Sequence, residues 1–272
     1  MLKLMYVTNN QIVAAIAQKA GIDRIWIDLE TKGKEERQKN LNTLKSHHCL
    51  DDIKKIRSVV TTSDLLVRVN PLDDESEQEI EKCIQYGADI IMLPMWKTVS
   101  DVKRFIEIID SRCKVMLLLE TKEAVECLDD VLNLHGIDEI HIGINDLSLS
   151  YKKKFMFEVL ANGLVDSLVK KISEKGIPYG FGGITRLSAG QIPAEIVIKE
   201  HYRLRSNMAI LAKSFCDLNS FNNYDDVENY FINNIKLIRD FEENVKKMSY
   251  DDYLNNHHEL QKKVEEIVGK MV

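Results

Sequence analysis

Two carboxylates near the middle of the chain, Glu120 and Asp146, have the residue type and spacing of a metal site. Glu120 directly follows the apolar run 115–119, and Asp146 follows a second apolar segment at 137–142. They are 26 positions apart, about one β/α repeat, so neighbouring parallel strands would bring both to one rim. Two carboxylates, with water and substrate oxygens, suit a hard divalent cation such as Mg²⁺. The alternative is that Glu120 caps the next helix and Asp146 begins a turn.

The segments around this pair alternate between strand and helix patterns. Apolar runs typical of buried strands are centred near residues 4, 26, 67, 91, 117, 140, 181 and 210, each followed by a helical segment. Eight such units in 272 residues, with no break in composition, predict one α/β domain over 1–272 closed into a (β/α)8 TIM barrel. A doubly wound open sheet is the alternative, but Thr-Asn-Asn at 8–10 is not the glycine-rich phosphate loop of that fold.

Two further helices are predicted after the eighth strand, within residues 224–272. The last one carries an apolar stripe at helical spacing, made of Val264, Ile267, Val268 and Met271. We expect these C-terminal helices to form a contact between copies of a homo-oligomer, because an exposed stripe of this kind marks an interaction surface. The alternative is that the last helix folds back over the amino-terminal end of its own barrel.

Composition excludes several other classes of protein. The formal charge of −6 argues against nucleic-acid binding, and no apolar run approaches the length of about 20 residues that a membrane span requires. Five scattered cysteines without a CxxC pair indicate reduced thiols, and hence a cytoplasmic protein.

Five short motifs, in order, resemble the HpcH/HpaI aldolase and citrate lyase family. They are Ile-Asp-Leu-Glu at 27–30, Val-Arg-Val-Asn-Pro at 67–71, Gly-Ala-Asp-Ile-Ile-Met-Leu-Pro-Met at 87–95, Leu-Glu-Thr at 119–121 and Gly-Ile-Asn-Asp-Leu-Ser at 143–148. The likeness runs from about residue 22 to residue 186. It implies a barrel of the phosphoenolpyruvate/pyruvate-binding superfamily.

The resemblance also implies roles for individual residues. Glu120 and Asp146 match the family's two metal ligands, and Arg68 matches the arginine that binds the carbonyl or enolate oxygen beside the metal. A divalent cation and a guanidinium both stabilise the negative charge of an enolate, which agrees with these roles. The backbone amides that hold the substrate carboxylate match Gly143, Ile144 and Asn145, and the acidic pair that orders metal-bound water matches Asp28 and Glu30.

The proton-transfer step departs from the family pattern. Thr31 stands where pyruvate aldolases have a histidine acid/base, and Thr31-Lys32 also differs from the Asp-Ala of citrate-lyase-like members. We therefore expect a metal-bound water, oriented by Glu30 and Asp28, to move the proton. His141 and the pair His47-His48 are the competing candidates; a hydrogen-bonded core histidine and an exposed pair are the plainer interpretations.

Together these features predict a carbon–carbon lyase or aldolase that uses a divalent metal and acts on a small 2-oxo acid. Mg²⁺ is the expected ion, with Mn²⁺ or Co²⁺ as alternatives. One alternative function is a citrate-lyase-like hydroxyacyl-CoA lyase, for which only the basic run Lys152 to Lys154 suggests a cofactor groove. The other is a non-catalytic relative that binds a carboxylate metabolite.

Overall fold

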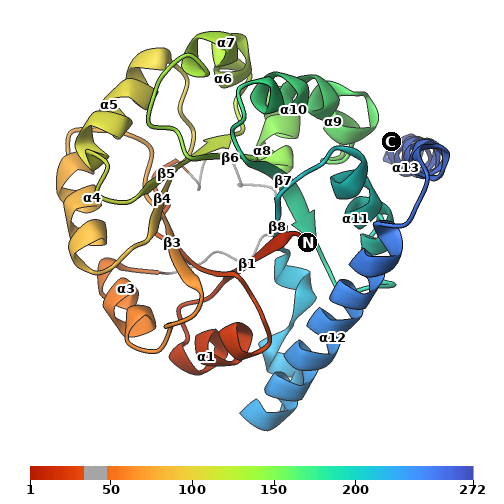
Figure 1. Cartoon of the computed structure of the whole chain (residues 1–272), viewed down its shortest axis with the longest axis horizontal. Coiled ribbons are helices and arrows are strands. Elements are labelled where there is room, and N and C mark those ends of the chain that lie inside the picture. Colours follow the sequence, from red (N-terminus) through yellow and green to blue (C-terminus); the bar gives the residue numbers. More distant parts are fainter. Residues whose placement is uncertain (34–47, 272) are drawn as a thin grey trace.

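The computed structural model describes residues 1–33 and 48–271. Eight parallel strands pair in sequence order, and β1 also pairs with β8, so the sheet closes into a barrel (Figure 1). The predicted TIM barrel is confirmed. The strands are β1 Lys3–Val7, β2 Arg24–Asp28, β3 Asp64–Arg68, β4 Ile90–Leu93, β5 Lys114–Leu119, β6 Glu139–Ile142, β7 Tyr179–Ile184 and β8 Met208–Leu211.

Helices surround the barrel and cover the outer face of the sheet (Figure 1). Within residues 155–175, two helices lie on either side of Gly163, whose φ of +82° suits glycine. A further short helix directly follows β6. The helices are α1 Gln11–Lys19, α3 Leu50–Arg57, α4 Ser76–Gln85, α5 Val99–Ile109, α6 Lys122–Glu126, α7 Leu128–Val131, α8 Ile144–Ser150, α9 Glu158–Ala161, α10 Leu164–Glu174, α11 Ala194–Arg203, α12 Tyr224–Val245 and α13 Tyr250–Lys270.

Alternating residues of each strand face the barrel interior or the helices, and the two faces have separate cores. The interior is filled mainly by methionine, leucine, isoleucine and tryptophan side chains, namely Met5, Trp26, Leu66, Ile90, Met92, Met116, Leu118 and Met208. The larger core lies between the sheet and the helices. A filled interior leaves the carboxyl ends of the strands as the rim on which polar side chains gather.

A buried ion pair closes the amino-terminal end of the barrel. Arg24, the first residue of β2, donates two hydrogen bonds of 2.6 and 2.7 Å to Glu139, the first residue of β6. Lys3 and Asp64, which begin β1 and β3, each have a charged atom 3.6 Å from this pair.

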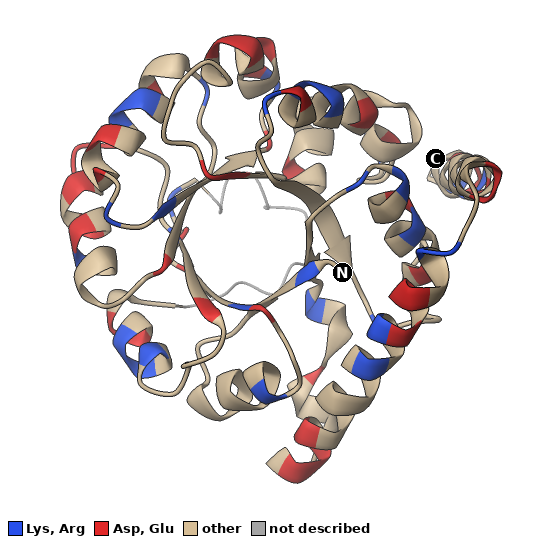
Figure 2. Cartoon of the chain, viewed as in Figure 1, with Lys and Arg blue, Asp and Glu red and all other residues tan. Residues whose placement is uncertain are grey.

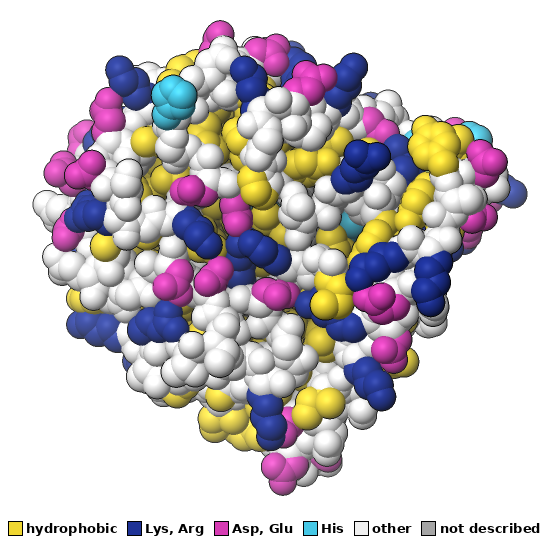
Figure 3. All heavy atoms as spheres, in the orientation of Figure 1, with side chains coloured by type: hydrophobic (Ala, Val, Ile, Leu, Met, Phe, Trp, Pro, Cys, Tyr) yellow, Lys and Arg dark blue, Asp and Glu magenta, His cyan; other side chains and the backbone are white. Residues whose placement is uncertain are grey.

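Figure 2 shows charged residues on the strands as well as on the helices, and Figure 3 shows both signs of charge gathered over the middle of the barrel.

The last helix packs against its own chain. Helix α13 lies along α9 and α11 on the outside of the barrel (Figure 1), and it does not cover the barrel end. Val264 is buried, and Ile267, Val268 and Met271 pack against the main hydrophobic core. The stripe on which the expected oligomer contact rested is thus covered within the chain, and oligomerisation stays a prediction.

Among the described residues, no helix has both the length and the apolar character of a membrane span.

Candidate active site

Glu120 and Asp146 reach the same rim from neighbouring strands. Strand β5 ends at Leu119, so Glu120 is the first residue beyond it, and Asp146 lies in the first turn of α8, shortly after β6. Strands β5 and β6 are paired, and both side chains line one cavity of about 320 Å³. The structure therefore brings together the two carboxylates that the sequence singled out.

The position of Glu120 depends on two backbone features that flank it. Its Oε1 accepts a hydrogen bond of 3.0 Å from the amide of Met95, which follows β4 and has a left-handed φ of +53°. A Cβ at position 143 would lie 2.8 Å from Oε2 of Glu120, closer than such contacts allow. Gly143 therefore leaves the space that the carboxylate occupies, and Met95 holds it there.

The surroundings of Glu120 favour its protonated form in the absence of a cation. Burial raises its pKa to about 8, and the nearby charges of Asp146 and Glu30 act in the same direction, while Arg68 opposes them. A cation bound between Glu120 and Asp146 would reverse this balance, because it favours the ionised carboxylate. Two hard oxygen donors beside a cavity therefore fit a Mg²⁺-type ion completed by water or substrate oxygens.

Arg68 is the last residue of β3. It is held by two acidic residues, Asp28 at the end of β2 and Glu30 two residues later. Its Nε and Nη2 donate to Oδ1 and Oδ2 of Asp28, both at 2.9 Å, and its Nη1 lies 3.1 Å from Oε2 of Glu30. The guanidinium also lies over the ring of Trp26, 5.2 Å from its centroid. A guanidinium has five N–H donors, so these partners leave donors for a substrate oxygen. Asp28 and Glu30 thus make direct contacts with Arg68, which the expected role of ordering metal-bound water did not include.

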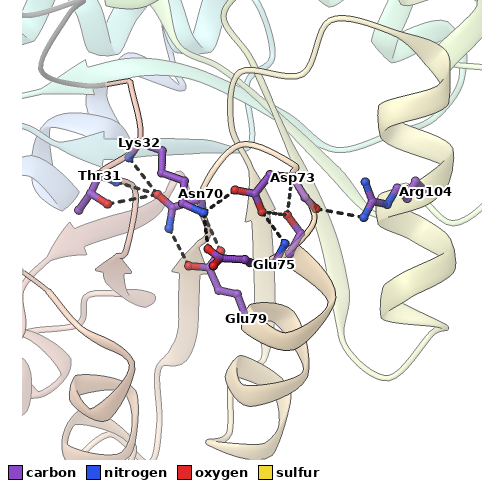
Figure 4. Close-up of polar contacts among 8 residues, drawn as sticks. Thr31, Lys32, Asn70, Asp73, Glu75, Glu79 and Arg104 are labelled. Carbon is purple, nitrogen blue, oxygen red and sulfur yellow. Dashed lines mark hydrogen bonds and ion pairs between the residues drawn. The ribbon is translucent and has the colours of Figure 1, made fainter.

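Asn70 anchors the chain that follows Glu30, and sequence analysis did not identify it. Its Oδ1 accepts hydrogen bonds from the amides of Thr31 and Lys32, at 2.9 and 3.1 Å. Its own Nδ2 donates to Glu79 at 2.7 Å, so the amide is fixed from both sides (Figure 4). In the sequence, only its position two residues after Arg68 could have indicated that Asn70 lies near the site.

The histidine candidates differ in their surroundings. His141 is fully buried inside the barrel, its Nε2 lies 3.2 Å from the carbonyl oxygen of Gly182, and burial lowers its pKa to about 3. It is a neutral core histidine. His48 is partly buried, and its Nδ1 accepts a hydrogen bond of 3.0 Å from the amide of Asp28. His47 lies outside the described residues.

The three amides expected to bind a substrate carboxylate are not equivalent. The amide of Gly143 donates to the carbonyl of Leu119 at 3.0 Å, so it is engaged in extending the pairing of β6 with β5. Ile144 and Asn145 lie in the first turn of α8, where amides have no acceptor within the helix.

Among the described residues, no cluster of three or more His, Cys, Asp or Glu side chains is arranged as a complete metal-ligand set.

A family model described as HpcH/HpaI aldolase/citrate lyase matches residues 3–159, which is more than half of the chain and includes every residue discussed above from Asp28 to Asp146. The chain belongs to the HpcH/HpaI aldolase/citrate lyase family. Among proteins of curated function, none matches the sequence.

Several solved structures have the same fold as the chain. An HpcH/HpaI aldolase from Desulfitobacterium hafniense DCB-2 is 14% identical with a TM-score of 0.61, covering 88% of this chain and 93% of that one. Macrophomate synthase is 14% identical with a TM-score of 0.54, covering 78% of this chain and 77% of that one. The citrate synthase SbnG is also 14% identical, with a TM-score of 0.57, covering 87% of this chain and 92% of that one. At these identities the likeness concerns the fold.

Proposed function

We propose that this member of the HpcH/HpaI family is a carbon–carbon lyase or aldolase that uses a divalent metal and acts on a small 2-oxo acid. The observation that carries the proposal is the common location of Glu120 and Asp146 on one cavity at the rim, with the charge of Arg68 acting on Glu120. A site that only bound a carboxylate would not need a group that stabilises an enolate.

Each residue has a defined task in this proposal. Glu120 and Asp146 hold the ion, for which Mg²⁺ is the best match and Mn²⁺ or Co²⁺ are alternatives. When bound, the ion supplies Lewis acidity at the 2-oxo oxygen. Arg68 donates to the same oxygen as it gains charge on the way to the enolate, since a planar fork can serve two partners at once.

The remaining residues orient these groups and the substrate. Asp28 and Glu30 keep the guanidinium of Arg68 in place, and their negative charge balances it when no substrate is present. The amides of Ile144 and Asn145 are suited to the substrate carboxylate, because the first turn of a helix favours an anion. Neither His141 nor Thr31 has the surroundings of a general base, which supports the acidic pair Asp28 and Glu30 as the group that orients a proton-carrying water.

The two alternative functions, a hydroxyacyl-CoA lyase and a non-catalytic binding protein, have less support from the contacts in the structure. The hydroxyacyl-CoA lyase alternative rested on Lys152 to Lys154, but Nζ of Lys154 donates to the carbonyl oxygen of Met271 at 3.2 Å, at the end of α13. This basic run therefore borders the C-terminal helix, and it is absent from the lining of the Glu120 cavity. A purely binding protein would not catalyse enolisation, which gives a direct test.

That test is exchange of the methyl hydrogens of pyruvate in deuterated water, followed by NMR. The proposal predicts exchange that requires Mg²⁺ or Mn²⁺, stops in EDTA and is lost in Asp146→Asn. Metal-independent exchange, or none with any of the three ions, would reject a metal-dependent enolate site. The assay needs no second substrate, so the identity of the carbonyl partner does not affect it.

A further inference from the structure

The imidazole of His141 is hydrogen-bonded to the backbone of the neighbouring strand. His141 lies on β6, where its register partners are Leu118 of β5 and Gly180 of β7, and its side chain is fully buried. Its Nε2 lies 3.2 Å from the carbonyl oxygen of Gly182, two residues further along β7. Burial lowers the pKa of the ring to about 3, so the ring is neutral near pH 7. A carbonyl oxygen can only accept, so the ring proton must be on Nε2 and His141 is the donor.

Strand β7 has a bulge where it receives this hydrogen bond. Its pairing with β8 shifts between Gly180 and Gly183, so that three steps along β7 correspond to two steps along β8. Gly182 lies within this shift and has a left-handed φ of +51°. A bulge interrupts the regular ladder of backbone hydrogen bonds, so a donor from another residue can determine where its backbone lies. His141 supplies such a donor from inside the barrel.

Two glycines of β7 leave the space that this arrangement requires. A Cβ at position 180 would lie 3.0 Å from Nδ1 of His141 and 2.3 Å from the carbonyl oxygen of Met208. A Cβ at position 182 would lie 2.6 Å from Cδ1 of Ile144. Gly180 therefore admits the imidazole, and Gly182 allows the bulge to pack directly against Ile144.

Ile144 connects the bulge with the candidate active site. It is buried, and it is the first residue of the short helix α8. Its amide and that of Asn145 are the two groups assigned to the substrate carboxylate, and Asp146 follows in the same turn. Because the side chain of Ile144 rests on Gly182, the position of the bulge determines where the first turn of α8 lies.

We propose that His141 is a positioning residue of the candidate active site. By holding the carbonyl of Gly182, it places Ile144 and the amides that bind the substrate carboxylate. The proposal rests on the proposed function, because it explains how one part of the same site is held. His141 is fully buried and does not line the cavity of Glu120, so it acts through the backbone of β7 and not on the substrate.

The kinetic test compares His141→Leu with His141→Gln in pyruvate methyl exchange at saturating Mn²⁺. Leucine has no donor, whereas the amide of glutamine can donate to the carbonyl of Gly182. In His141→Leu we expect KM for pyruvate to rise by at least about tenfold, the usual effect of losing a hydrogen bond to a charged group. We expect kcat to change little, because a contact that holds ground state and transition state equally affects KM alone. His141→Gln should recover most of the loss.

Gly182→Ala disturbs the same contact without changing the imidazole. The added Cβ would push against Ile144, so we expect a similar rise in KM. The effects of Gly182→Ala and His141→Leu should not add in the double variant, because both act through the position of Ile144. Fully additive effects would overturn the proposal.

Two controls separate positioning from stability. Ile238→Ala removes buried apolar atoms from α12, outside the barrel, and should lower Tm without changing KM. His135→Leu removes an exposed imidazole before β6 and should change neither quantity. An unchanged KM in folded His141→Leu, or an equal rise of KM in Ile238→Ala, would overturn the positioning role.

NMR of the full chain tests the proposal without relying on activity. In ¹⁵N–¹H spectra, the amide signals of Ile144 and Asn145 should move in His141→Leu, return toward their wild-type positions in His141→Gln and stay in place in Ile238→Ala. The ¹⁵N shifts of the wild-type ring should show the proton on Nε2. Unmoved amide signals, or a ring proton on Nδ1, would overturn the proposal. If the wild type shows no exchange of pyruvate, the proposed function fails, and these spectra alone decide whether His141 positions α8.

Discussion

Asp28 and Arg68 are register partners on the paired strands β2 and β3, and their side chains form a two-point ion pair at 2.9 Å for both contacts. The orientation of the guanidinium is therefore fixed by adjacent strand ends and not by a loop. This geometry suits a residue that must present its remaining N–H donors in one direction. It also makes the side chain difficult to replace by another cation.

Arg68→Lys tests that geometry. Lysine keeps the charge but cannot make the two-point contact with Asp28, so we expect pyruvate exchange to fall by about 100-fold while Mn²⁺ affinity changes little. Exchange rates and metal titration measure the two effects separately. Arg112→Lys, on the surface beside Glu81, is the control. Near-native exchange in Arg68→Lys would show that the guanidinium does not stabilise the enolate.

Gly143→Ala tests the space around Glu120. The added Cβ would lie 2.8 Å from Oε2 and 3.0 Å from Cβ of Glu120, so the carboxylate must move away from its place beside Asp146. We expect weaker metal binding by at least about tenfold in a protein that still folds. Gly269→Ala in α13 is the matched control, because nothing lies within 4 Å of its added Cβ. Equal metal affinity in both variants would contradict this explanation of Gly143.

Glu120→Gln tests the raised pKa through stability. The pKa of this carboxyl is about 8 in the folded chain, against an ordinary value of 4.5, so its stabilising contribution is complete at low pH and is lost as the pH rises toward and through 8. One pKa unit corresponds to about 1.4 kcal/mol, so ionised Glu120 destabilises the metal-free protein by a few kcal/mol.

In EDTA, therefore, Glu120→Gln should melt several degrees above the wild type at pH 9 and close to it at pH 5. Thermal unfolding followed by circular dichroism measures both. A Tm difference that is the same at the two pH values would mean that the Glu120 carboxyl is not perturbed.

Glu139→Gln tests the ion pair at the other end of the barrel. Removing the charge of Glu139 leaves the fully buried Arg24 with only the carboxylate of Asp64, 3.6 Å away, and the loss of one partner of a buried pair typically costs about 3–5 kcal/mol. Urea unfolding should show this loss. The double variant Arg24→Met, Glu139→Leu should recover most of it, because apolar replacements of a buried pair are often neutral or better. A single variant as stable as wild type would show that the pair contributes little.

The sequence was sufficient for the parts of the site that depend on strand order. The apolar runs located all eight strands, and a polar residue directly after such a run must lie on the carboxyl rim. Glu120 followed from that reasoning alone, whereas Arg68 was identified through the resemblance to the family. The strands on either side of these residues could also be inferred, because consecutive strands pair in a barrel.

Features that depend on loop conformation could not be predicted. The left-handed φ of Met95, the clearance at Gly143 and the bond from Asp28 to His48 all arise from segments between regular elements. The stripe on α13 has a related explanation. Its spacing predicted an apolar face, but whether that face meets another copy or α9 and α11 depends on the direction of the chain after α12.

The claim on which the account depends is that Glu120 and Asp146 share one divalent ion. Mn²⁺ titration followed by electron paramagnetic resonance measures this directly, because bound and free Mn²⁺ give different signals. We predict one Mn²⁺ per chain in the wild type, displaced by excess Mg²⁺, and a loss of affinity of at least about 100-fold in both Glu120→Gln and Asp146→Asn. Unchanged binding in either variant would contradict the shared site.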